Sequence, residues 1–276
     1  MTSENSKVEA KDLGLDLDHM RLSLDEERGV ATLTIHRPGK MNAVTMPMRD
    51  QISDIFQTLE RDGRTRLVVI KSADEKAFTS GGDIGAFMEA DAGTLSMLHR
   101  NVAAPERFPG PVIAAIDGYC FGVGMEMSLA CDFRVATTRS VFGLPEIGLG
   151  MIPGSGGTQR VSRLVGMTRA KDMIMRRRRI PAPEAHDWGL ITEVVEPENL
   201  DEAVENITSD LLAHSRLAME TAKRVLDLGH DAPIETALQL EGYAYGMLRG
   251  TEDFAEGVAS FVEKRKANFE DGGNSR

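Results

Sequence analysis

Hydrophobic and polar residues alternate along residues 20–35 of this chain, which has 276 residues. In the second half of that segment, Ala31, Leu33 and Ile35 fall on one face, with threonines between them. Strict alternation of this kind is typical of a half-buried strand. A polar turn around residues 27–29 divides the segment, so the pattern predicts a β-hairpin.

A helical pattern follows the hairpin. Thr45 is a residue type that caps helices, and Pro47 suits the first helical turn. Apolar residues then recur three and four positions apart, which predicts a helix with one buried face. Residues 67–71 are rich in β-branched side chains and predict a buried strand. The apolar helical positions are Met48, Ile52, Ile55, Phe56 and Leu59.

The order of strand, loop and helix then repeats along the chain. A loop at residues 78–83 precedes helical patterns within residues 84–102 and a strand at residues 111–117. Another helix is expected after residue 122, before a strand at residues 132–136. Such repeats predict an α/β architecture in which the loops at one end of the strands carry the chemistry.

The C-terminal part has a different character. Almost all of residues 199–269 are compatible with helix, with breaks near residues 213–215, 229–233 and 250–251. The apolar faces of such helices need a partner surface, which is either the core or another subunit.

The chain therefore divides into three predicted parts. Residues 1–19 are acidic overall and lack an apolar run, so they resemble neither a secretory signal nor a transit peptide. We expect them to form a disordered leader. An α/β catalytic core at residues 20–198 and a helical C-terminal region at residues 199–276 follow.

Composition is that of an ordinary globular protein, with 41% hydrophobic and 27% charged residues. The net charge of −11 opposes binding to nucleic acid phosphates and to anionic membrane surfaces. No apolar stretch approaches the roughly 18 residues that a membrane span needs. We therefore expect no nucleic acid partner and no membrane partner. Cys120 and Cys131 lack a paired spacing, which favours reduced thiols in a cytoplasmic protein.

One local basic run opposes the overall charge. Residues 176–179 are four consecutive arginines, and Lys171 lies just upstream. The run allows two interpretations, which are contact with a phosphate group and a solvated helix end.

Several catalytic signatures are absent from the sequence. It contains no GxSxG, HExxH, Walker or complete GxGxxG motif and no CxxC spacing. The six histidines are scattered singly, so we expect no metal site. Nucleotide hydrolysis and nicotinamide chemistry both lose support.

Glu126 and Glu146 stand in the most glycine-dense stretch of the chain, residues 118–157. Two carboxylates that meet at one site can give protons to and take protons from the same small molecule. Residues 80–83 and 122–124 each lead into a helical pattern and offer backbone amides at a helix N-terminus. Two such amides can stabilise a developing negative oxygen, although glycine turns that only pack helices against strands would have the same spacing. Carboxylates beside such a hole suit enolate chemistry at the carbon next to a carbonyl.

Six segments in the same order resemble the crotonase, or enoyl-CoA hydratase/isomerase, family over residues 22–269. The resemblance implies an α/β fold, a spiral of ββα repeats followed by a C-terminal helical trimerisation region. It also implies a homotrimer or a dimer of trimers. The matching segments are residues 76–84, 111–119, 122–132, 142–150, 152–160 and 261–269.

The resemblance assigns roles to the glycine-rich stretch. It implies that the backbone amides of Gly82 and Val123 bind the thioester oxygen of an acyl-CoA. Glu126 would then activate water for addition at Cβ, and Glu146 would supply the proton at Cα, with the two carboxylates titrating as a coupled pair. Val123 stands where the family commonly has glycine, and its β-branched side chain adds bulk beside the acyl carbon. The methionines that flank Glu126 either shape an adaptable pocket or pack in the core.

The resemblance also implies the coenzyme A contacts, partly through backbone groups. Coenzyme A is part of the substrate, so no separate cofactor is expected. Lys264 either neutralises phosphate charge or belongs to an ordinary exposed helix face. The implied contact residues are Lys40, Asn42, Ala43, Ala77, Phe78, Ser80, Asp83, Ile84, Tyr245, Phe261 and Lys264.

These expectations favour an enoyl-CoA hydratase, a hydro-lyase of the kind found in fatty acid metabolism. It would add water reversibly to a 2-trans-enoyl-CoA and give a 3-hydroxyacyl-CoA. The alternatives are a Δ3,Δ2-enoyl-CoA isomerase or another acyl-CoA-processing crotonase, such as a hydrolase or decarboxylase. A more remote alternative is a non-catalytic, RNA-binding member, which the net charge of −11 disfavours.

Overall fold

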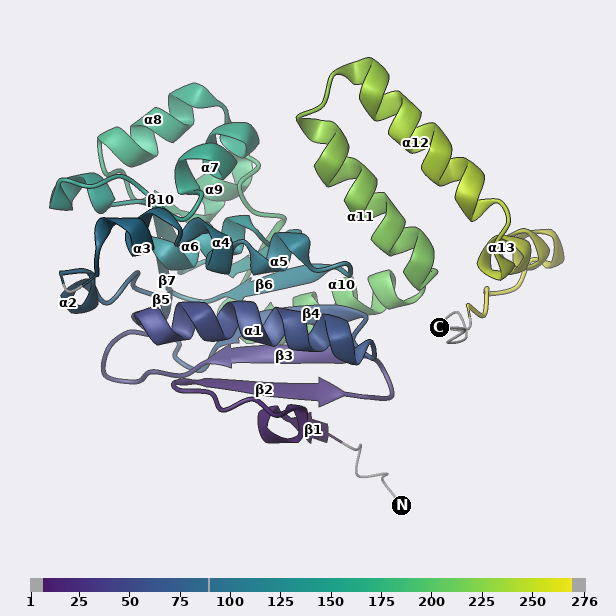
Figure 1. The fold of residues 1–276 in the computed structure, drawn as a ribbon, viewed down its shortest axis with the longest axis horizontal. Helices are drawn as coiled ribbons and strands as arrows, with labels where there is room; N and C mark the ends of the chain where they lie inside the picture. The colour runs from purple at the N-terminus through teal and green to yellow at the C-terminus, as the bar shows by residue number, and fades with distance from the viewer. Residues whose placement is uncertain (1–6, 89, 270–276) are drawn as a thin grey trace. The chain divides into compact units, whose positions relative to one another are not determined.

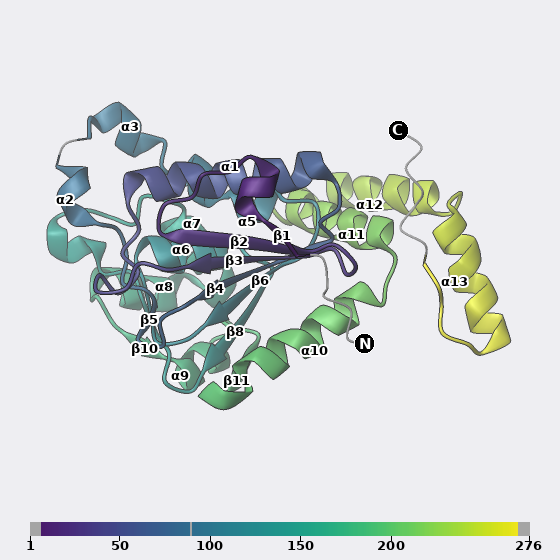
Figure 2. The same ribbon diagram turned by 90° about the horizontal axis from the view of Figure 1, so that it is seen from below.

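In the part of the chain that the structure describes, the larger of two β-sheets has seven strands, in the order β1-β2-β3-β4-β6-β8-β11. The computed structural model describes residues 7–88 and 90–269 (Figure 1). β1, β2 and β3 are antiparallel neighbours, which confirms the predicted hairpin, and the strands from β3 to β11 are parallel. Figure 2 shows these strands fanning out with the twist expected of a sheet. Their bounds are Lys7–Glu9 for β1, Met20–Asp25 for β2, Val30–Ile35 for β3, Leu67–Ser72 for β4, Val112–Ile116 for β6, Phe133–Thr137 for β8 and Glu193–Val195 for β11.

The smaller sheet has four short strands, in the order β10-β9-β7-β5. β5, β7 and β9 are parallel neighbours, and β10 is antiparallel to β9. The chain alternates between the sheets, because β4, β6 and β8 of the larger sheet are followed by β5, β7 and β9 of the smaller one, and helices follow each pair. This alternation is the expected spiral of ββα repeats. The bounds are Ala77–Thr79 for β5, Tyr119–Phe121 for β7, Val141–Gly143 for β9 and Ile180–Pro181 for β10.

Helix α1 (Met46–Asp62) begins where the sequence predicts. Thr45 is its N-cap, and the Thr45 hydroxyl accepts a hydrogen bond from the amide of Met48 at 3.3 Å. Its apolar stripe is buried, and the helix runs alongside β2 and β3 in both views (Figures 1 and 2). The following helices are short: α2 Ile84–Phe87, α3 Ala92–Ser96, α4 His99–Val102, α5 Ala104–Arg107, α6 Val123–Leu129, α7 Gly157–Val165, α8 Met167–Met175 and α9 Ala182–Asp187, with 3-10 turns η2 Glu146–Leu149 and η3 Pro197–Asn199.

Helix α6 is buried along its whole length, including the side chains of the two methionines that flank Glu126. These methionines therefore pack in the core. Arg134 on β8 closes the end of the helix, because its Nη1 donates to the carbonyl oxygens of Ser128 at 3.0 Å and Cys131 at 2.6 Å. Its Nε donates to the carbonyl oxygen of Leu190 at 2.8 Å. The last turn of α6 is thus bound by a buried guanidinium.

From residue 7 onward, the structure differs from the disordered leader that the sequence predicts, because these residues form a strand and a 3-10 turn. β1 pairs with β2, with Val8 opposite Leu24, and a 3-10 turn, η1 (Ala10–Leu13), follows. Apolar residues at alternate positions explain the order, since Leu13, Leu15 and Leu17 are partly buried against the hydrophobic core. Residues 1–6 of the leader lie outside the described residues.

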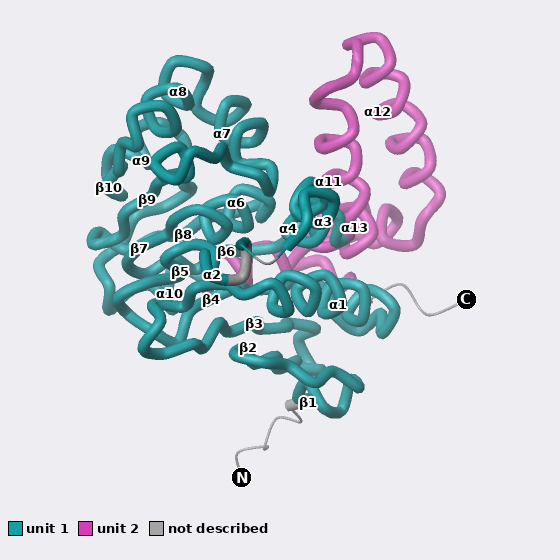
Figure 3. The backbone as a smooth tube through the Cα atoms, turned by 60° about the vertical axis from the view of Figure 1, so that its left-hand side comes forward, with its two compact units in different colours: residues 1–108, 112–204 teal, residues 109–111, 205–276 magenta. Residues whose placement is uncertain are grey.

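The chain forms two compact units (Figure 3). Unit 1 contains residues 1–108 and 112–204, and unit 2 contains residues 109–111 and 205–276. The division falls six residues beyond the 198/199 boundary expected from the sequence. The C-terminal helices break where the sequence predicts, with bounds α10 Leu200–Leu212, α11 Arg216–His230, α12 Ile234–Leu248 and α13 Glu252–Glu263. In the described parts of the chain, no helix is long and apolar enough to cross a membrane.

Candidate active site

Three loops meet at one edge of the smaller sheet. Because β5, β7 and β9 are parallel neighbours, the segments after residues 79, 121 and 143 leave the sheet on the same side. The first segment carries Gly82, the second Val123 and the third Glu146. The sheet order therefore brings together residues that are separated by up to 64 positions in the sequence.

Gly122 lies where these loops approach one another closely. Its φ of 52° and ψ of −127° lie in a region that residues with a Cβ rarely adopt. A Cβ at this position would lie 3.2 Å from Oε1 of Glu146, 3.4 Å from Cα of Gly81 and 4.0 Å from the amide nitrogen of Gly82. The absence of a side chain thus lets the backbone of residues 81–82 and the side chain of Glu146 both approach the backbone of Gly122.

The two expected oxyanion donors are available beside Gly122. Val123 is the first residue of α6, so its amide has no acceptor within the helix. Gly82 is bridged to Val44, but that bridge uses the Gly81 carbonyl and the Asp83 amide, at 2.9 Å each. Among the hydrogen bonds of residues 7–88 and 90–269, neither the Gly82 nor the Val123 amide is a donor. The Val123 side chain is buried in the hydrophobic core.

Glu126 is a buried carboxylate, with 2% of its surface exposed. Its Oε1 accepts hydrogen bonds from the backbone amides of Ser155 at 2.6 Å and Gly157 at 2.9 Å. Gly157 is the first residue of α7, so the carboxylate lies at a helix N-terminus, where the helix dipole favours negative charge. These contacts fix one oxygen of Glu126.

Glu146 opens the 3-10 turn η2. Within the described residues, its Oε2 is buried and has no hydrogen-bond partner. Burial raises the pKa of Glu146 from 4.5 to about 7, and the charge of Glu126 adds to this rise. A hydrogen bond from its own backbone amide and the charge of Arg49 act in the opposite direction. At neutral pH, Glu146 is therefore poised between a proton donor and a proton acceptor.

Arg49 is a site residue that sequence reasoning missed. It lies on α1 with 3% of its surface exposed, and its Nη1 donates to Oγ of Ser155 at 2.9 Å. Burial lowers the pKa of Arg49, whereas the charges of Glu126 and Glu146 raise it. The sequence carried a signal, because residue 49 shares the apolar face of the helix with Ile52 and Phe56 at helical spacing. A charged residue on a buried face needs a counter-charge.

The geometry allows acid–base chemistry on a carbonyl compound. Two amides can hold an oxyanion, and two carboxylates, one fixed and one with a pKa of about 7, lie beside them. A model of the enoyl-CoA hydratase/isomerase family matches residues 25–272. The chain belongs to this family, the crotonases.

Individual crotonases support the assignment across most of the chain. A crotonyl-CoA hydratase of Syntrophomonas wolfei is 38% identical over 254 residues, which cover 89% of this chain and 96% of the relative. A short-chain-enoyl-CoA hydratase of Clostridium acetobutylicum is 36% identical over 250 residues, covering 88% and 95%. The crystal structure of an enoyl-CoA hydratase from Bacillus anthracis matches with a TM-score of 0.84 and 35% identity, covering 88% of this chain and 96% of that one.

Eight of the residues expected to contact coenzyme A lie in unit 1, and the structure brings seven of them together on adjoining loops. The loop containing Lys40, Asn42 and Ala43 runs beside residues 77–83, because the Ser80 amide donates to the Met41 carbonyl at 2.9 Å. Nδ2 of Asn42 donates to the Ala77 carbonyl at 2.9 Å. The side chains of Ala77 and Phe78 are buried, which leaves their backbone groups for any contact. Ile84, the eighth, is exposed at the start of α2.

Asp83 belongs to the same pair of loops. Nη1 of Arg37 donates to the Asp83 carboxylate at 2.9 Å and to the Ala43 carbonyl at 3.0 Å. This hydrogen bond from Arg37 holds the pKa of Asp83 below its usual value. Arg37 therefore ties the loop of residues 40–43 to the segment after β5 that carries Gly82.

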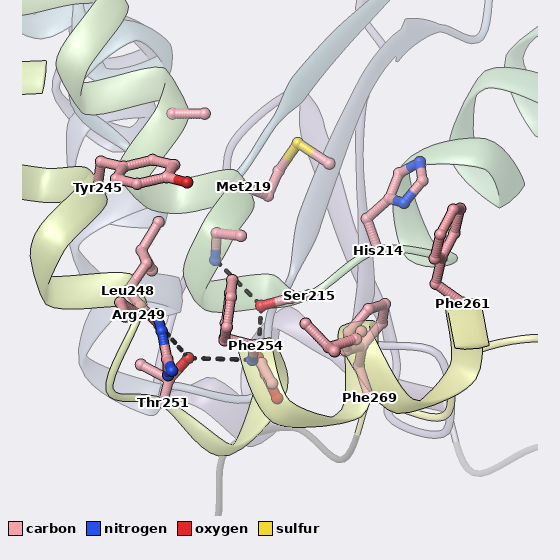
Figure 4. Close-up of a pocket in the computed structure, with 15 residues that line it drawn as sticks. His214, Ser215, Met219, Tyr245, Leu248, Arg249, Thr251, Phe254, Phe261 and Phe269 are labelled. Carbon is pink, nitrogen blue, oxygen red and sulfur yellow. Dashed lines mark hydrogen bonds between the residues drawn. The ribbon is translucent and has the colours of Figure 1, made fainter. Parts of the chain in front are cut away.

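The other three expected contact residues lie in unit 2. Tyr245 and Phe261 line an apolar cavity of about 690 Å³ among α11, α12 and α13 (Figure 4). Lys264 is the C-cap of α13, with a left-handed φ of 55°, and its side chain is exposed. These three positions belong to the helical C-terminal unit.

The arginine run of residues 176–179 is largely engaged in contacts within unit 1. Arg176 pairs with Asp172 at 2.6 Å, and Arg178 contacts the carboxylates of Asp172 and Glu184 at 2.9 and 2.7 Å. The guanidinium of Arg179 lies 5.3 Å from the centre of the Phe121 ring. These contacts favour a structural role over phosphate binding.

Proposed function

We propose that this crotonase adds water reversibly across the double bond of a 2-trans-enoyl-CoA. The observation that carries the proposal is the meeting of Glu126 and Glu146 beside two backbone amides that have no acceptor among the described residues. The names of the relatives in Syntrophomonas wolfei and Clostridium acetobutylicum support the same activity. The enzyme is accordingly a hydro-lyase.

In the proposed reaction, the amides of Gly82 and Val123 hold the thioester oxygen. Glu126 takes a proton from water, and the water oxygen forms a bond to Cβ. The electron pair of the double bond moves toward the thioester, whose oxygen gains negative charge that the two amides stabilise. Glu146 then supplies the proton that forms the new bond at Cα. Its pKa of about 7 leaves a substantial protonated fraction near neutral pH.

The need for two carboxylates separates hydration from its alternatives. A Δ3,Δ2-enoyl-CoA isomerase needs only one base to move a proton between two carbons. A non-catalytic RNA-binding role would need a basic face, which the net charge of −11 does not favour. The buried oxygen of Glu146 that has no partner among the described residues supports a second functional carboxylate, and hence hydration.

A direct assay tests the activity. Purified protein is incubated with crotonyl-CoA, and loss of the conjugated enoyl thioester absorbance is followed for the wild type, Glu126→Gln and Glu146→Gln. We expect hydration by the wild type and a loss of about 10²–10⁴-fold in each variant, which is typical of removing a general acid or base. Glu60→Gln, an exposed change on α1, is the matched control and keeps full activity.

Other outcomes would redirect the assignment. Inertness of the wild type on enoyl-CoAs of several chain lengths, or unchanged hydration by Glu126→Gln, would refute the hydratase proposal. Isomerisation of a 3-enoyl-CoA without hydration would identify an isomerase.

The remaining expectations are part of the same proposal. We propose a homotrimer or a dimer of trimers, supported by large exposed side chains on the helices of unit 2, such as Tyr243 at 79% and Phe261 at 85% exposure. Light scattering with size-exclusion chromatography measures this. Two buried free cysteines support a cytoplasmic location. Coenzyme A, as part of the substrate, would contact the loops of residues 40–43 and 77–84 and the side chains of Tyr245, Phe261 and Lys264, with no further cofactor.

A further inference from the structure

Arg49 is placed where a charged residue is costly. Its side chain is buried on the inner face of α1, and moving an ion out of water costs several kcal/mol unless charges and hydrogen bonds compensate for it. Arg61, on the same helix, is exposed and bonds only to Gln57 among the contacts described for its side chain. The burial of Arg49 therefore calls for compensating groups inside the protein.

Those compensating groups are the two glutamates of the site. The charges of Glu126, on α6, and Glu146, on η2, both act on Arg49, as does that of Asp50, the exposed neighbour on its own helix. Ser155 links Arg49 to Glu126 through hydrogen bonds. Its hydroxyl accepts from Arg49 at 2.9 Å, and its backbone amide donates to Glu126 at 2.6 Å.

We propose that Arg49 is a positioning residue for the carboxylate pair. It fixes the segment from Ser155 to Gly157 that holds Glu126, and it supplies the positive charge that keeps one of the two carboxylates ionised while the other carries a proton. The role rests on the proposed hydration, because that reaction needs one carboxylate of each kind at the same time.

The two parts of this role have separable consequences. Loss of the guanidinium removes a positive charge that acts on both glutamates, so the pKa of Glu146 rises further. Hydration that uses protonated Glu146 declines as pH rises through that pKa, and the decline moves to higher pH when the charge is lost. Loss of the hydrogen bond to Ser155 loosens the segment that orients Glu126, and small misplacements of a catalytic group can cost up to about 100-fold in rate.

Four variants distinguish the parts, with crotonyl-CoA as substrate. Arg49→Met removes charge and hydrogen bond, Arg49→Lys keeps the charge, Ser155→Ala removes the hydroxyl but keeps the backbone amide, and Arg61→Met is the control. We expect Arg49→Met to lose about tenfold to 100-fold in kcat with little change in KM, and to move the alkaline decline upward. Arg49→Lys and Ser155→Ala should lower kcat but keep the decline where the wild type has it.

Each result either supports or overturns the proposal. A folded Arg49→Met variant with the kcat and pH profile of the wild type refutes it. If Arg49→Met does not fold, Arg49→Lys and Ser155→Ala test the proposal instead. A wild-type kcat in both variants would show that the hydrogen bond from Arg49 to Ser155 does not position Glu126. Arg61→Met should have the kcat and the pH profile of the wild type. An equal loss of kcat in Arg61→Met would show that any change in α1 lowers the rate, and would overturn the proposal.

A measurement without substrate separates this proposal from the hydratase assignment. Carbon-13 resonances of the glutamate carboxyl carbons are followed against pH in the free protein, and Glu146 is assigned by its absence in Glu146→Gln. We expect the Glu146 titration to move to higher pH in Arg49→Met and to stay in place in Arg61→Met. If the wild type does not hydrate enoyl-CoAs while this titration moves, the hydratase proposal fails and the electrostatic link stands. If the wild type hydrates enoyl-CoAs but the Glu146 titration in Arg49→Met stays where the wild type has it, the hydratase proposal stands and the electrostatic link fails.

Discussion

Replacing Glu146 by glutamine should make the protein more stable, and more so at high pH than at low pH. The pKa of Glu146 is raised from 4.5 to about 7 in the folded state, chiefly by burial. The folded protein thus holds this proton more tightly than the unfolded chain does. Stability is therefore lost as pH rises from about 4.5 to about 7 and stays at the lower level above that range. Glutamine does not ionise, so the variant escapes this loss.

The shift sets the size of the effect. A rise from 4.5 to about 7, at about 1.4 kcal/mol per pKa unit, corresponds to about 3 kcal/mol as an upper bound, because the Glu146 side chain is only partly buried. For a chain of this length, 1 kcal/mol changes Tm by roughly 2–4 °C. The Tm advantage of Glu146→Gln over the wild type should therefore be several degrees larger at about pH 8.5 than at about pH 5.5.

Thermal unfolding followed by intrinsic fluorescence at a series of pH values measures this difference. Glu60→Gln, an exposed change on α1, is the matched control and should show the same small Tm difference at every pH. The reasoning is refuted if the Tm difference between Glu146→Gln and the wild type does not grow with pH, or if it shrinks.

Three more predictions follow from the site. Hydration of crotonyl-CoA should decline as pH rises through about 7, because it uses protonated Glu146. Dehydration of 3-hydroxybutyryl-CoA should instead decline as pH falls through the same range. Initial rates measured in both directions test this. Gly122→Ala should cost about 1–3 kcal/mol of stability, because alanine is strained at a φ of 52°. It should also lower kcat more than it raises KM, because the alanine Cβ would lie 3.2 Å from Glu146 Oε1. Tm and steady-state kinetics measure the two effects, and an unchanged kcat would contradict the geometry. Asn42→Asp should cost about 1–3 kcal/mol and raise KM for crotonyl-CoA, because the buried Asn42 amide group no longer donates to the Ala77 carbonyl at 2.9 Å, which keeps its hydrogen bond from the Ser72 hydroxyl at 2.8 Å. An unchanged Tm would show that the hydrogen bond from Asn42 is dispensable.

Elements fixed by local chemistry were predictable from the sequence. Thr45 caps α1 as expected, because its hydroxyl needs only the amide three residues on. The β2–β3 hairpin turns where its alternating pattern is interrupted, and the breaks between the C-terminal helices fall at the predicted positions. The neighbourhood of Glu126 and Glu146 was also expected, although there it came from the resemblance to crotonases rather than from spacing.

Features that depend on contacts between distant residues could not be predicted from the sequence. The strands β5, β7, β9 and β10 have only two or three residues each, which is too short for a periodic pattern to form, and only their mutual pairing defines them. The order of residues 7–19 depends on a core built from later segments. The helical pattern places the charge of Arg49 on an apolar face, but the glutamates that compensate for it, Glu126 and Glu146, lie more than 70 residues away in the sequence.

The guanidinium of Arg134 has a consequence for how the enzyme loses activity. A helix of seven residues has little stability of its own, and α6 exists because its surroundings bury it and bind its terminal carbonyl groups. Opening α6 therefore requires breaking its links to β8 and to Leu190 at the same time. Because the helix that carries Glu126 is buried and bound to a strand of the larger sheet, we expect loss of activity on heating to coincide with global unfolding rather than precede it.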